Sequence, residues 1–516
     1  MQQSQSKQQV GGILGFIERI GNKIPDITIL FISAFLLVCV VSAVLAQIHF
    51  NYVHPATGRP IEITNMLSGK ALVDLMSKMV TNYANFPPLS MVIVATLGIG
   101  IADGSGYINT GLKKILSITP KVLITPVVIL VGMLSHLGPD SGYVIIIPIA
   151  AYMFYAVGKH PLAGIAASFA GIAGAFAANY TPSAIDPVIQ GFTQSAAQII
   201  DPGYQVNVLC NYFYAFASTF IVIGACWWVT EKITNPWLWK ACPLDDDLDL
   251  GNENNSSITP SENRAFKIAT AVLLLMLTGL AAALYPADSI LRAPDGVIAS
   301  FKAPIMQSIV SLIFILAALV GLVYGIACGK FKSPKDVTAA MEEITKTLVQ
   351  LIVFYFFAAQ FLYAFGASNM GALIAVSGAE FLKSLNLPPQ VTVFGIIVFV
   401  ALLNLIITSA SAKWAILAPI FVPMLMAVGI APELTQVAFR VSDSAVNVVT
   451  PMFAFYPLII LYCQKYVKNA GIGTLSSMML PYTIALLVSL TFMLYLFWWL
   501  DIPLGFQADY VYPRRF

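Results

Sequence analysis

The sequence predicts an all-α polytopic membrane protein with nine transmembrane helices and two re-entrant helical hairpins that are arranged as inverted repeats. Composition is the first observation behind this fold class. Of the 516 residues, 58% are hydrophobic and only 10% are charged, whereas soluble domains carry about a quarter charged residues. The mean hydropathy of +0.81 agrees with this. The other two observations are a pair of interrupted apolar segments and a repeated pattern of proline and glycine.

Apolar segments long enough to cross a bilayer recur along the whole chain, since a spanning helix needs about 20 apolar residues. The first of them is too long for a cleavable signal peptide, so we expect it to remain as the first span. The segments lie at about 27–48, 87–103, 122–157, 162–199, 207–229, 265–285, 305–327, 347–378, 390–429, 434–463 and 475–499.

Segments 122–157 and 390–429 are each too long for one crossing, and small and polar residues interrupt both of them near the middle. The interruptions lie at 135–142 and 408–413. Non-helical backbone survives at membrane depth only where protein or a water-filled cavity satisfies its polar groups. We therefore expect each segment to enter and leave on the same side, as hairpin 1 and hairpin 2.

The basic residues favour a topology with a cytoplasmic N-terminus. If both hairpins return to the side they entered from, 17 of the 27 lysines and arginines lie in the cytoplasm and 8 lie outside. Cytoplasmic loops carry an excess of Lys and Arg, so this arrangement satisfies the positive-inside rule. It leaves only Lys413 and Arg440 within the membrane.

The two hairpins and the spans that follow them share a pattern at a separation of 271 residues. Inverted repeats of this kind occur in many secondary transporters; chance similarity of two apolar stretches is the alternative. The chain then divides into a first half at 1–229 with hairpin 1, a cytoplasmic linker at 230–264, and a second half at 265–516 with hairpin 2. The matched positions are Pro148-Ile149 with Pro419-Ile420, Ala156-Val157-Gly158 with Ala427-Val428-Gly429, and Pro161 with Pro432.

Polar side chains inside the predicted spans mark candidate binding sites, because such groups are costly in a membrane. Each half brings a hairpin tip to a helix that proline interrupts. Helix N-termini attract a carboxylate, and the hydroxyl, amide and carbonyl oxygens at these breaks suit a sodium ion. The candidate ion-coupling residues are Ser135, Asp140, Ser141, Asn179, Thr181, Ser409, Ser444 and Asn447, and the hinge or tip prolines are Pro139, Pro182, Pro432 and Pro451.

Two large side chains of the second half suit an aromatic anion, and each has a structural alternative. Arg440 could bind a substrate carboxylate bidentately, or it could neutralise Asp443, which lies three residues away on the same helix face. Trp414 could stack on an aromatic ring, or it could serve only the packing of hairpin 2. In the first half, Asp186 precedes a proline and could simply cap a helix end.

Several classes of protein do not fit this sequence. A Walker A pattern is absent, so ATP-driven transport is not expected. Neither a nucleophile elbow nor an H-E-x-x-H motif is present, so we expect no enzyme and no cofactor. We expect a coupling ion instead, either Na+ or H+, with Na+ held near the hairpin tips. A channel is the alternative, and it would need a continuous polar pore in place of two dead-end hairpins.

Four stretches resemble signatures of the p-aminobenzoyl-glutamate transporter (AbgT) family: Glu18–Pro25, Gly158–Gly164, Ser409–Met424 and Phe439–Ser444. The resemblance covers nearly the whole chain. It implies a homodimer in the bacterial inner membrane, with a fold similar to that of divalent-anion/sodium symporters. It also implies cation-coupled transport of p-aminobenzoyl-glutamate or related folate-pathway aromatic anions, with export of sulfonamide-type drugs by some members. Another dicarboxylate-like anion is the alternative substrate.

The partners that the resemblance implies are a small anionic substrate and the lipid bilayer, with no nucleic acid. At the tip of hairpin 1, residues 136–140 read His-Leu-Gly-Pro-Asp, where the family has a turn rich in Ser, Asn and Thr. This departure makes Asp140 a candidate proton carrier in place of a sodium ligand. The family's functional residues fall here on Asp186, Asn404, Ser411, Trp414, Pro432, Arg440, Asp443 and Pro451, and all except the prolines are expected to bind substrate.

Overall fold

The computed structural model describes residues 26–53, 58–135, 141–183, 185–245, 258–300 and 302–513. In these ranges the regular structure is helical apart from two isolated bridges. Seven of the described helices are long and apolar enough to cross a membrane. The number rises to as many as nine if each of two bent helix pairs counts as one span. The prediction of an all-helical, multi-pass membrane protein is confirmed.

The first described helix is α2, whose first turn is capped by Asp26: its side chain accepts a hydrogen bond from the backbone N–H of Thr28. A left-handed Gly106, with φ of 93°, separates α4 from α5. The elements are α2 (Ile27–Leu45), α3 (Gly69–Ala84), α4 (Pro87–Ser105), α5 (Tyr107–Ser117), η1 (Lys121–Leu123), α6 (Ile124–Leu134), α7 (Ser141–Ala156), α8 (Pro161–Ala173), α9 (Ile185–Ala197), α10 (Tyr212–Val229), the π-helical turn η3 (Thr230–Thr234) and α11 (Asn235–Ala241).

Helix α12, which begins just before residue 265, starts with a capping box formed by Thr259 and Glu262. The range 230–264, predicted as a linker, therefore holds η3, α11 and the first turn of α12, and its residues 246–257 lie outside the described part. The elements are α12 (Pro260–Leu284), α13 (Pro304–Gln307), α14 (Ile309–Ala327), α15 (Pro334–Lys346), α16 (Val349–Ala367), α17 (Met370–Ser384), α18 (Pro389–Asn404), α19 (Ala410–Met426), α20 (Pro432–Val446), α21 (Tyr456–Gln464) and α22 (Ile472–Trp499).

Both hairpins are present as helix pairs that are broken where the sequence predicts. In hairpin 1, α6 ends at Leu134 and α7 begins at Ser141; in hairpin 2, α18 ends at Asn404 and α19 begins at Ala410. The two arms of each hairpin pack on the helix that follows, α6 and α7 on α8, and α18 and α19 on α20. A sharp bend also precedes each hairpin, of 120° between α5 and α6 and of 116° between α17 and α18.

The helices after the hairpins repeat with the spacing found in the sequence. Helices α8 and α20 begin 271 residues apart, at Pro161 and Pro432, and α9 and α21 keep the same separation. Gly158 and Gly429, which join each hairpin to the next helix, are both left-handed, with φ of 79° and 87°. Packing crosses between the halves: α9 contacts α19 and α20, while α21 contacts α7 and α8. The break after α8 and the break after α20 are thereby brought to one place.

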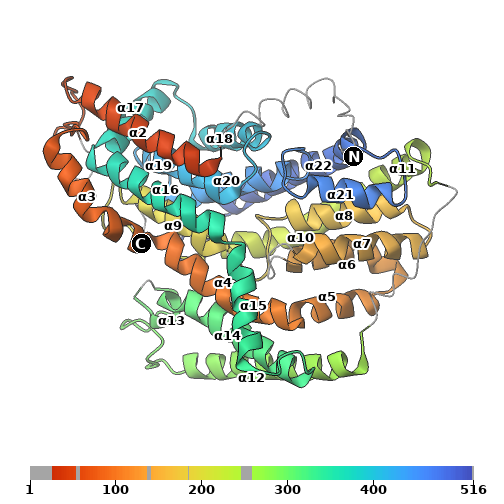
Figure 1. Cartoon of the computed structure of the whole chain (residues 1–516). Helices are drawn as coiled ribbons and strands as arrows, with labels where there is room; N and C mark the ends of the chain where they lie inside the picture. Colours follow the sequence, from red (N-terminus) through yellow and green to blue (C-terminus); the bar gives the residue numbers. More distant parts are fainter. Residues whose placement is uncertain are drawn as a thin grey trace, which may run out of the picture.

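The helices form two groups by their contacts, and Figure 1 shows α5, α12 and α14 below α6 to α8 and α20 to α22. The scaffold comprises α2 to α5 and α12 to α16, in which α14 and α15 pack on α4, and α16 packs on α2 and α3. The core comprises α6 to α10 and α18 to α22, in which α22 packs on α10 and α20. Contacts of α4 with α9 and of α5 with α6 join the two groups, and α17 packs on both α16 and α19. The hairpins and broken helices therefore all belong to the core.

Three amphipathic helices of the scaffold lie outside the apolar segments that the sequence shows. Helix α3 falls between the predicted apolar segments 27–48 and 87–103, and α5 and α15 likewise lie between predicted segments. Each mixes charged and apolar residues, so none forms the long apolar run that marks a span. At the start of α15, the backbone N–H groups of Lys332 and Ser333 hold the pKa of Asp336 below its ordinary value.

The end of the chain is fastened to the junction between hairpin 2 and α20. Ile430 and Val511 form an antiparallel bridge, and the N–H of Ala431 donates to the carbonyl of Tyr510 at 3.1 Å. The Tyr510 ring stacks on Trp498 of α22, with 5.8 Å between the ring centroids. The corresponding junction of hairpin 1 is held by α11 and the residue after it instead, through Asn235 and Cys242, which both bind His160.

Candidate functional site

A cavity of about 350 Å³ lies where both hairpin tips, both helix breaks and the scaffold meet. Its volume is within the range of small-molecule sites. Most of its wall is apolar or aromatic, and a minority of hydroxyl, amide and carboxylate groups face it. The lining residues are Val92, Thr96, Ile99, Ser135, Gly142, Tyr143, Ile172, Ala173, Phe176, Ser183, Ile185, Val188, Thr347, Leu348, Leu351, Thr408, Ala410, Ser411, Asp443, Asn447 and Phe453.

At the wall of the cavity, Asp443 forms an ion pair with Lys413 at 2.5 Å, and both side chains are completely buried. The ammonium of Lys413 also donates to Oδ1 of Asn404. The amide of Asn404 in turn donates to the backbone carbonyl of Asp443 at 2.8 Å and to Oδ1 of Asn447 at 3.1 Å. This network ties the end of α18, the first turn of α19 and the second half of α20 together.

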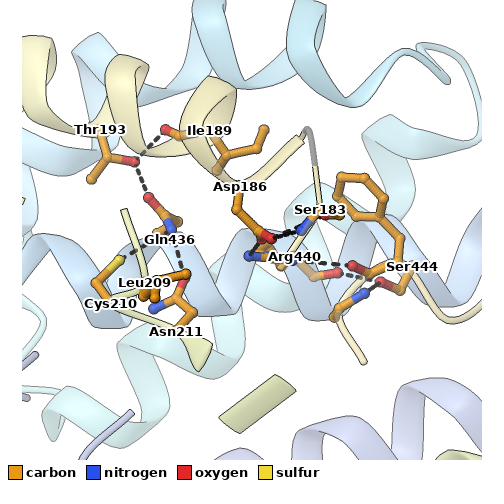
Figure 2. Close-up of polar contacts among 12 residues, drawn as sticks. Ser183, Asp186, Ile189, Thr193, Leu209, Cys210, Asn211, Gln436, Arg440 and Ser444 are labelled. Atoms are coloured by element: carbon orange, nitrogen blue, oxygen red, sulfur yellow. Dashed lines mark hydrogen bonds and ion pairs between the residues drawn. The ribbon is translucent and has the colours of Figure 1, made fainter. Parts of the chain in front are cut away.

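A second ion pair joins the two halves: Arg440 on α20 binds Asp186 in the first turn of α9 at 2.7 Å (Figure 2). Oδ2 of Asp186 also accepts hydrogen bonds from the backbone N–H and the hydroxyl of Ser183, at 2.7 and 3.0 Å. Arg440 donates further to the carbonyl of Phe176 at 3.2 Å. Arg440 and Asp443 thus have separate partners and do not neutralise each other, while Asp186 serves both as a helix-end residue and as a counter-ion.

Trp414 is completely buried and is not among the residues that line the cavity. Its ring stacks on Phe439 of α20, with 4.5 Å between the centroids, and its N–H donates to the hydroxyl of Thr193 at 2.9 Å. Thr193 donates to Gln436 at 2.6 Å, and Gln436 donates to Asn211 at 2.6 Å (Figure 2). In this conformation the indole serves packing between α19, α9 and α20.

Several predicted ion-coupling hydroxyls are used by local backbone. Ser135 lines the cavity and donates to the carbonyl of Gly132 at 2.6 Å. Ser409 caps α19, and Ser444 accepts from the N–H of Ala177 at 2.5 Å and donates to the carbonyl of Arg440 at 2.8 Å. The bond between Ala177 and Ser444 places the break after α8 against α20. Sodium binding by these residues stays a prediction.

The remaining candidates divide between the helix breaks and the tip of hairpin 1. Thr181 donates to Asn179 at 3.5 Å in the break after α8, which also holds Pro182. Pro451 lies in the break after α20, and Pro432 is the first residue of that helix. Pro139 and Asp140 lie outside the described residues, as does the side chain of Ser141, whose backbone begins α7. Within the described part of the chain, no three His, Cys, Asp or Glu residues are grouped to hold a metal ion.

The sequence offers Lys413 among the polar candidates at the break of hairpin 2, but it does not indicate the partner of this lysine. Glu433 is not predicted as a site residue; it is completely buried and accepts a hydrogen bond from the hydroxyl of Tyr204 at 2.9 Å. A spacing signal was available, because residues three and four apart share one helix face. The polar residues with that spacing on α20 and at its C-cap are Glu433, Gln436, Arg440, Asp443 and Asn447.

A multi-pass helical protein in which two broken hairpins meet at one cavity has the architecture of a membrane transporter. Comparison with known proteins agrees. Residues 12–512 match the family model described as the AbgT putative transporter family, and the chain belongs to this family. It is a transporter and not an enzyme, and the resemblance inferred from its motifs is confirmed.

Relatives match over nearly the full length. The p-aminobenzoyl-glutamate transport protein of Escherichia coli (strain K12) is 32% identical over 511 residues, which cover 99% of this chain and 98% of that protein. The YdaH transporter of Alcanivorax borkumensis is 37% identical, with a TM-score of 0.87 over 93% of this chain and 100% of that one. MtrF of Neisseria gonorrhoeae, assigned to a class of antimetabolite efflux pumps, is 39% identical, with a TM-score of 0.90 over 96% and 100% of the two chains.

Proposed function

We propose that the chain is a cation-coupled secondary transporter of p-aminobenzoyl-glutamate or a related folate-pathway aromatic anion. The observation that carries this proposal is the cavity between the two hairpin tips. Its aromatic residues Tyr143, Phe176 and Phe453 offer faces for a benzoyl ring. The hydroxyls of Thr408 and Ser411 offer hydrogen bonds to an amide or a carboxylate.

The helix ends around this cavity favour an anion. Gly142 in the first turn of α7, Ala410 at the start of α19 and Ile185 at the start of α9 all line it. Helix N-termini carry partial positive charge and unpaired N–H groups, so three of them directed at one cavity attract carboxylates. The charges of Asp443 and Arg440 are each offset by a partner, so these pairs add little net charge to the site.

The transport step that we propose is a movement of the core against the scaffold. The wall of the cavity combines core residues with Val92 and Thr96 of α4 and with Leu351 of α16. A displacement of the core would separate these two parts of the wall and open the cavity. Such a rocking or sliding of a hairpin-bearing unit is how alternating access is achieved around a fixed site.

We place the protein in the bacterial inner membrane as a homodimer with a cytoplasmic N-terminus. The distribution of basic residues supports this orientation. Helix α12 supports a scaffold that faces lipid or a second copy, since very little of it is buried within the chain and Leu274 and Leu275 are exposed.

Uptake of radiolabelled p-aminobenzoyl-glutamate into proteoliposomes, under an imposed Na+ or H+ gradient, tests the proposal. We expect gradient-dependent accumulation that falls at least tenfold in Ser411→Ala, which alters the cavity wall. Ser377→Ala is the matched control, because its hydroxyl binds only its own helix α17 and does not line the cavity. Absence of gradient-driven flux in folded protein overturns the proposal, and flux that never exceeds equilibration indicates a channel.

Export of sulfonamide-type drugs is a second candidate, favoured by the similarity to MtrF over nearly the whole chain. The mainly apolar wall of the cavity suits a neutral aromatic sulfonamide as well as an anion. If a sulfonamide competes with p-aminobenzoyl-glutamate for uptake, and Ser411→Ala abolishes transport of both compounds, the two compounds bind in one site. If cells that carry Ser411→Ala still export the sulfonamide at the wild-type rate, sulfonamide export does not use this cavity.

A further inference from the structure

Lys413 is a buried charged residue to which the proposed function gives no role of its own. It lies in the first turn of α19, directly after the break of hairpin 2, and its side chain is completely buried. Its ammonium lies 5.8 Å from the centre of the Phe439 ring. An ionisable group at this depth is costly and is a functional candidate by default.

The groups around the ammonium are those that a small metal cation would choose. A carboxylate oxygen of Asp443 lies at 2.5 Å and Oδ1 of Asn404 is a direct hydrogen-bond acceptor. Asn447 adjoins them, through its hydrogen bonds to Asn404 and Asp443 at 3.1 and 3.4 Å. Hard cations bind carboxylate and amide oxygens of this kind. The ammonium group of Lys413, which is covalently part of hairpin 2, already lies among these oxygen atoms.

We propose that Lys413 is a tethered cation that takes the place of a coupling sodium ion at hairpin 2. The coupling part of this inference rests on the proposed transport function; the occupancy part does not. With Lys413 charged, the pair with Asp443 is neutral. Release of one proton from the ammonium leaves a neutral amine beside the carboxylate, so the site loses the same single charge that a departing sodium ion would remove.

The pair is placed to respond to the substrate. Asp443 and Asn447 line the cavity as well as belonging to the network around Lys413. A substrate carboxylate that enters the cavity and accepts hydrogen bonds from Asn447 competes with the hydrogen bond from Asn447 to Asp443. Substrate binding thereby changes the surroundings of the Lys413–Asp443 ion pair. Proton exchange at the pair and substrate binding therefore act on the same two side chains.

The other charged groups on neighbouring elements do not compete for Lys413. Helix α19 packs on α9, α17 and α20. Asp186 is the one charged residue of α9 and is paired with Arg440 of α20. Glu433, at the start of α20, is bound by Tyr204. On α17, Glu380 and Lys383 are exposed, and α18 carries no charged residue.

Exchange of Na+ for K+ at constant ionic strength tests the occupancy. We expect the melting temperature of the purified wild-type protein to be the same in both salts. In Lys413→Ala the oxygens are left without their cation, so Na+ should raise the melting temperature saturably, by several degrees. Adding Asp443→Asn to Lys413→Ala should abolish this response. Lys383→Ala, an exposed lysine on α17, is the matched control and should behave as the wild type.

Two results would overturn the proposal: saturable stabilisation of the wild type by Na+ over K+, or folded Lys413→Ala that shows no such stabilisation. If Lys413→Ala does not fold, binding of radioactive Na+ to the wild type decides, since saturable binding that Asp443→Asn removes contradicts a tethered cation. A measurement of proton release completes the test. Substrate addition should change the number of protons bound to the wild-type protein and should leave that number unchanged in Lys413→Met. Failure to move p-aminobenzoyl-glutamate would refute the proposed function and leave the cation exchange result standing.

Discussion

Helices α8 and α20 hold equivalent positions in the two halves, and every residue of both is buried, yet their side chains differ in kind. The sequence of α8 contains no ionisable residue, and its glycines make the closest contacts. A Cβ added to Gly164 would come within 2.4 Å of the carbonyl of Ala150, and one added to Gly171 within 2.5 Å of that of Ile129. In α20 the corresponding interior is a stripe of polar and charged residues that binds α9, α18 and α19.

The difference shows that the two hairpins are held by different forces. Hairpin 1 is fixed to α8 by close backbone packing, which depends on small residues in the way that membrane helices often associate. Hairpin 2 is fixed to α20 by an ion pair and amide hydrogen bonds, which a proton or a ligand can change. The symmetry of the halves therefore describes their backbone, while the chemistry of the site belongs mainly to the second half.

The largest effect is expected from Asp443→Asn, which leaves the Lys413 ammonium buried without its carboxylate. Removing one partner of a buried pair costs about 3–5 kcal/mol, so we expect that loss of stability in detergent unfolding, together with loss of transport. The double variant Lys413→Met with Asp443→Asn should recover most of the stability but none of the transport. Asp295→Asn, in an exposed loop, serves as control. If Asp443→Asn is as stable as the wild type, the ion pair between Lys413 and Asp443 does not hold hairpin 2 on α20.

A smaller loss is expected from Asp186→Asn, which weakens the link between the break after α8 and helix α20. Hydrogen bonds to charged groups contribute about 1.5–3 kcal/mol, so the free energy of unfolding should fall by about 2 kcal/mol. Ser183→Ala removes only one neutral donor to the same carboxylate and should cost less. If Asp186→Asn lowers substrate affinity tenfold while stability is unchanged, the pair acts in binding instead of joining the halves.

Gly164→Ala tests the packing of the first half. The new methyl group meets backbone, which cannot move aside, and overpacking of this kind costs about 1–3 kcal/mol. Gly224→Ala in α10 is the matched control, because a Cβ there has open space and alanine favours the helix by about 0.5–1 kcal/mol. If Gly224→Ala lowers the stability and Gly164→Ala does not, close backbone packing is not what holds hairpin 1 on α8.

The smallest effect is expected from Trp414→Phe, which keeps an aromatic ring on Phe439 but loses the N–H bond to Thr193. A net hydrogen bond is worth about 1 kcal/mol, so stability should fall by about that amount while substrate affinity stays within twofold. Trp414→Ala, which also leaves a cavity, should cost about 3–5 kcal/mol. A tenfold loss of affinity in a stable Trp414→Phe would show that the indole contacts substrate during the cycle.

Local pattern was enough to predict much of the fold. Small and polar residues within long apolar segments located both hairpin breaks, and Pro161 and Pro432 placed the repeat where the helices begin. The amphipathic helices of the scaffold were harder, because α3 and α15 have no long apolar run and are stabilised by packing on α16 and α4. Their existence depends on tertiary contacts that a hydropathy profile does not contain.

For the site, the sequence could indicate which residues are candidates but not how they pair. Asp186 and Arg440 are 254 positions apart, so nothing in the local pattern joins them. Asp443 had a nearer possible partner on its own helix, yet the fold brings Lys413 to it from hairpin 2. The same applies to Trp414, whose burial against Phe439 follows from the crossing of α19 and α20 and not from its own sequence context.

The bridge between Ile430 and Val511 has a consequence for the order in which the protein is made. Val511 follows Ile430 by 81 residues, and Cys242 follows His160 by 82, so each junction is clamped by a segment that is made a similar length of chain later. The junction of hairpin 1 can therefore be complete while the second half is still being made. The half that carries the charges is secured only after α20 to α22 have been synthesised.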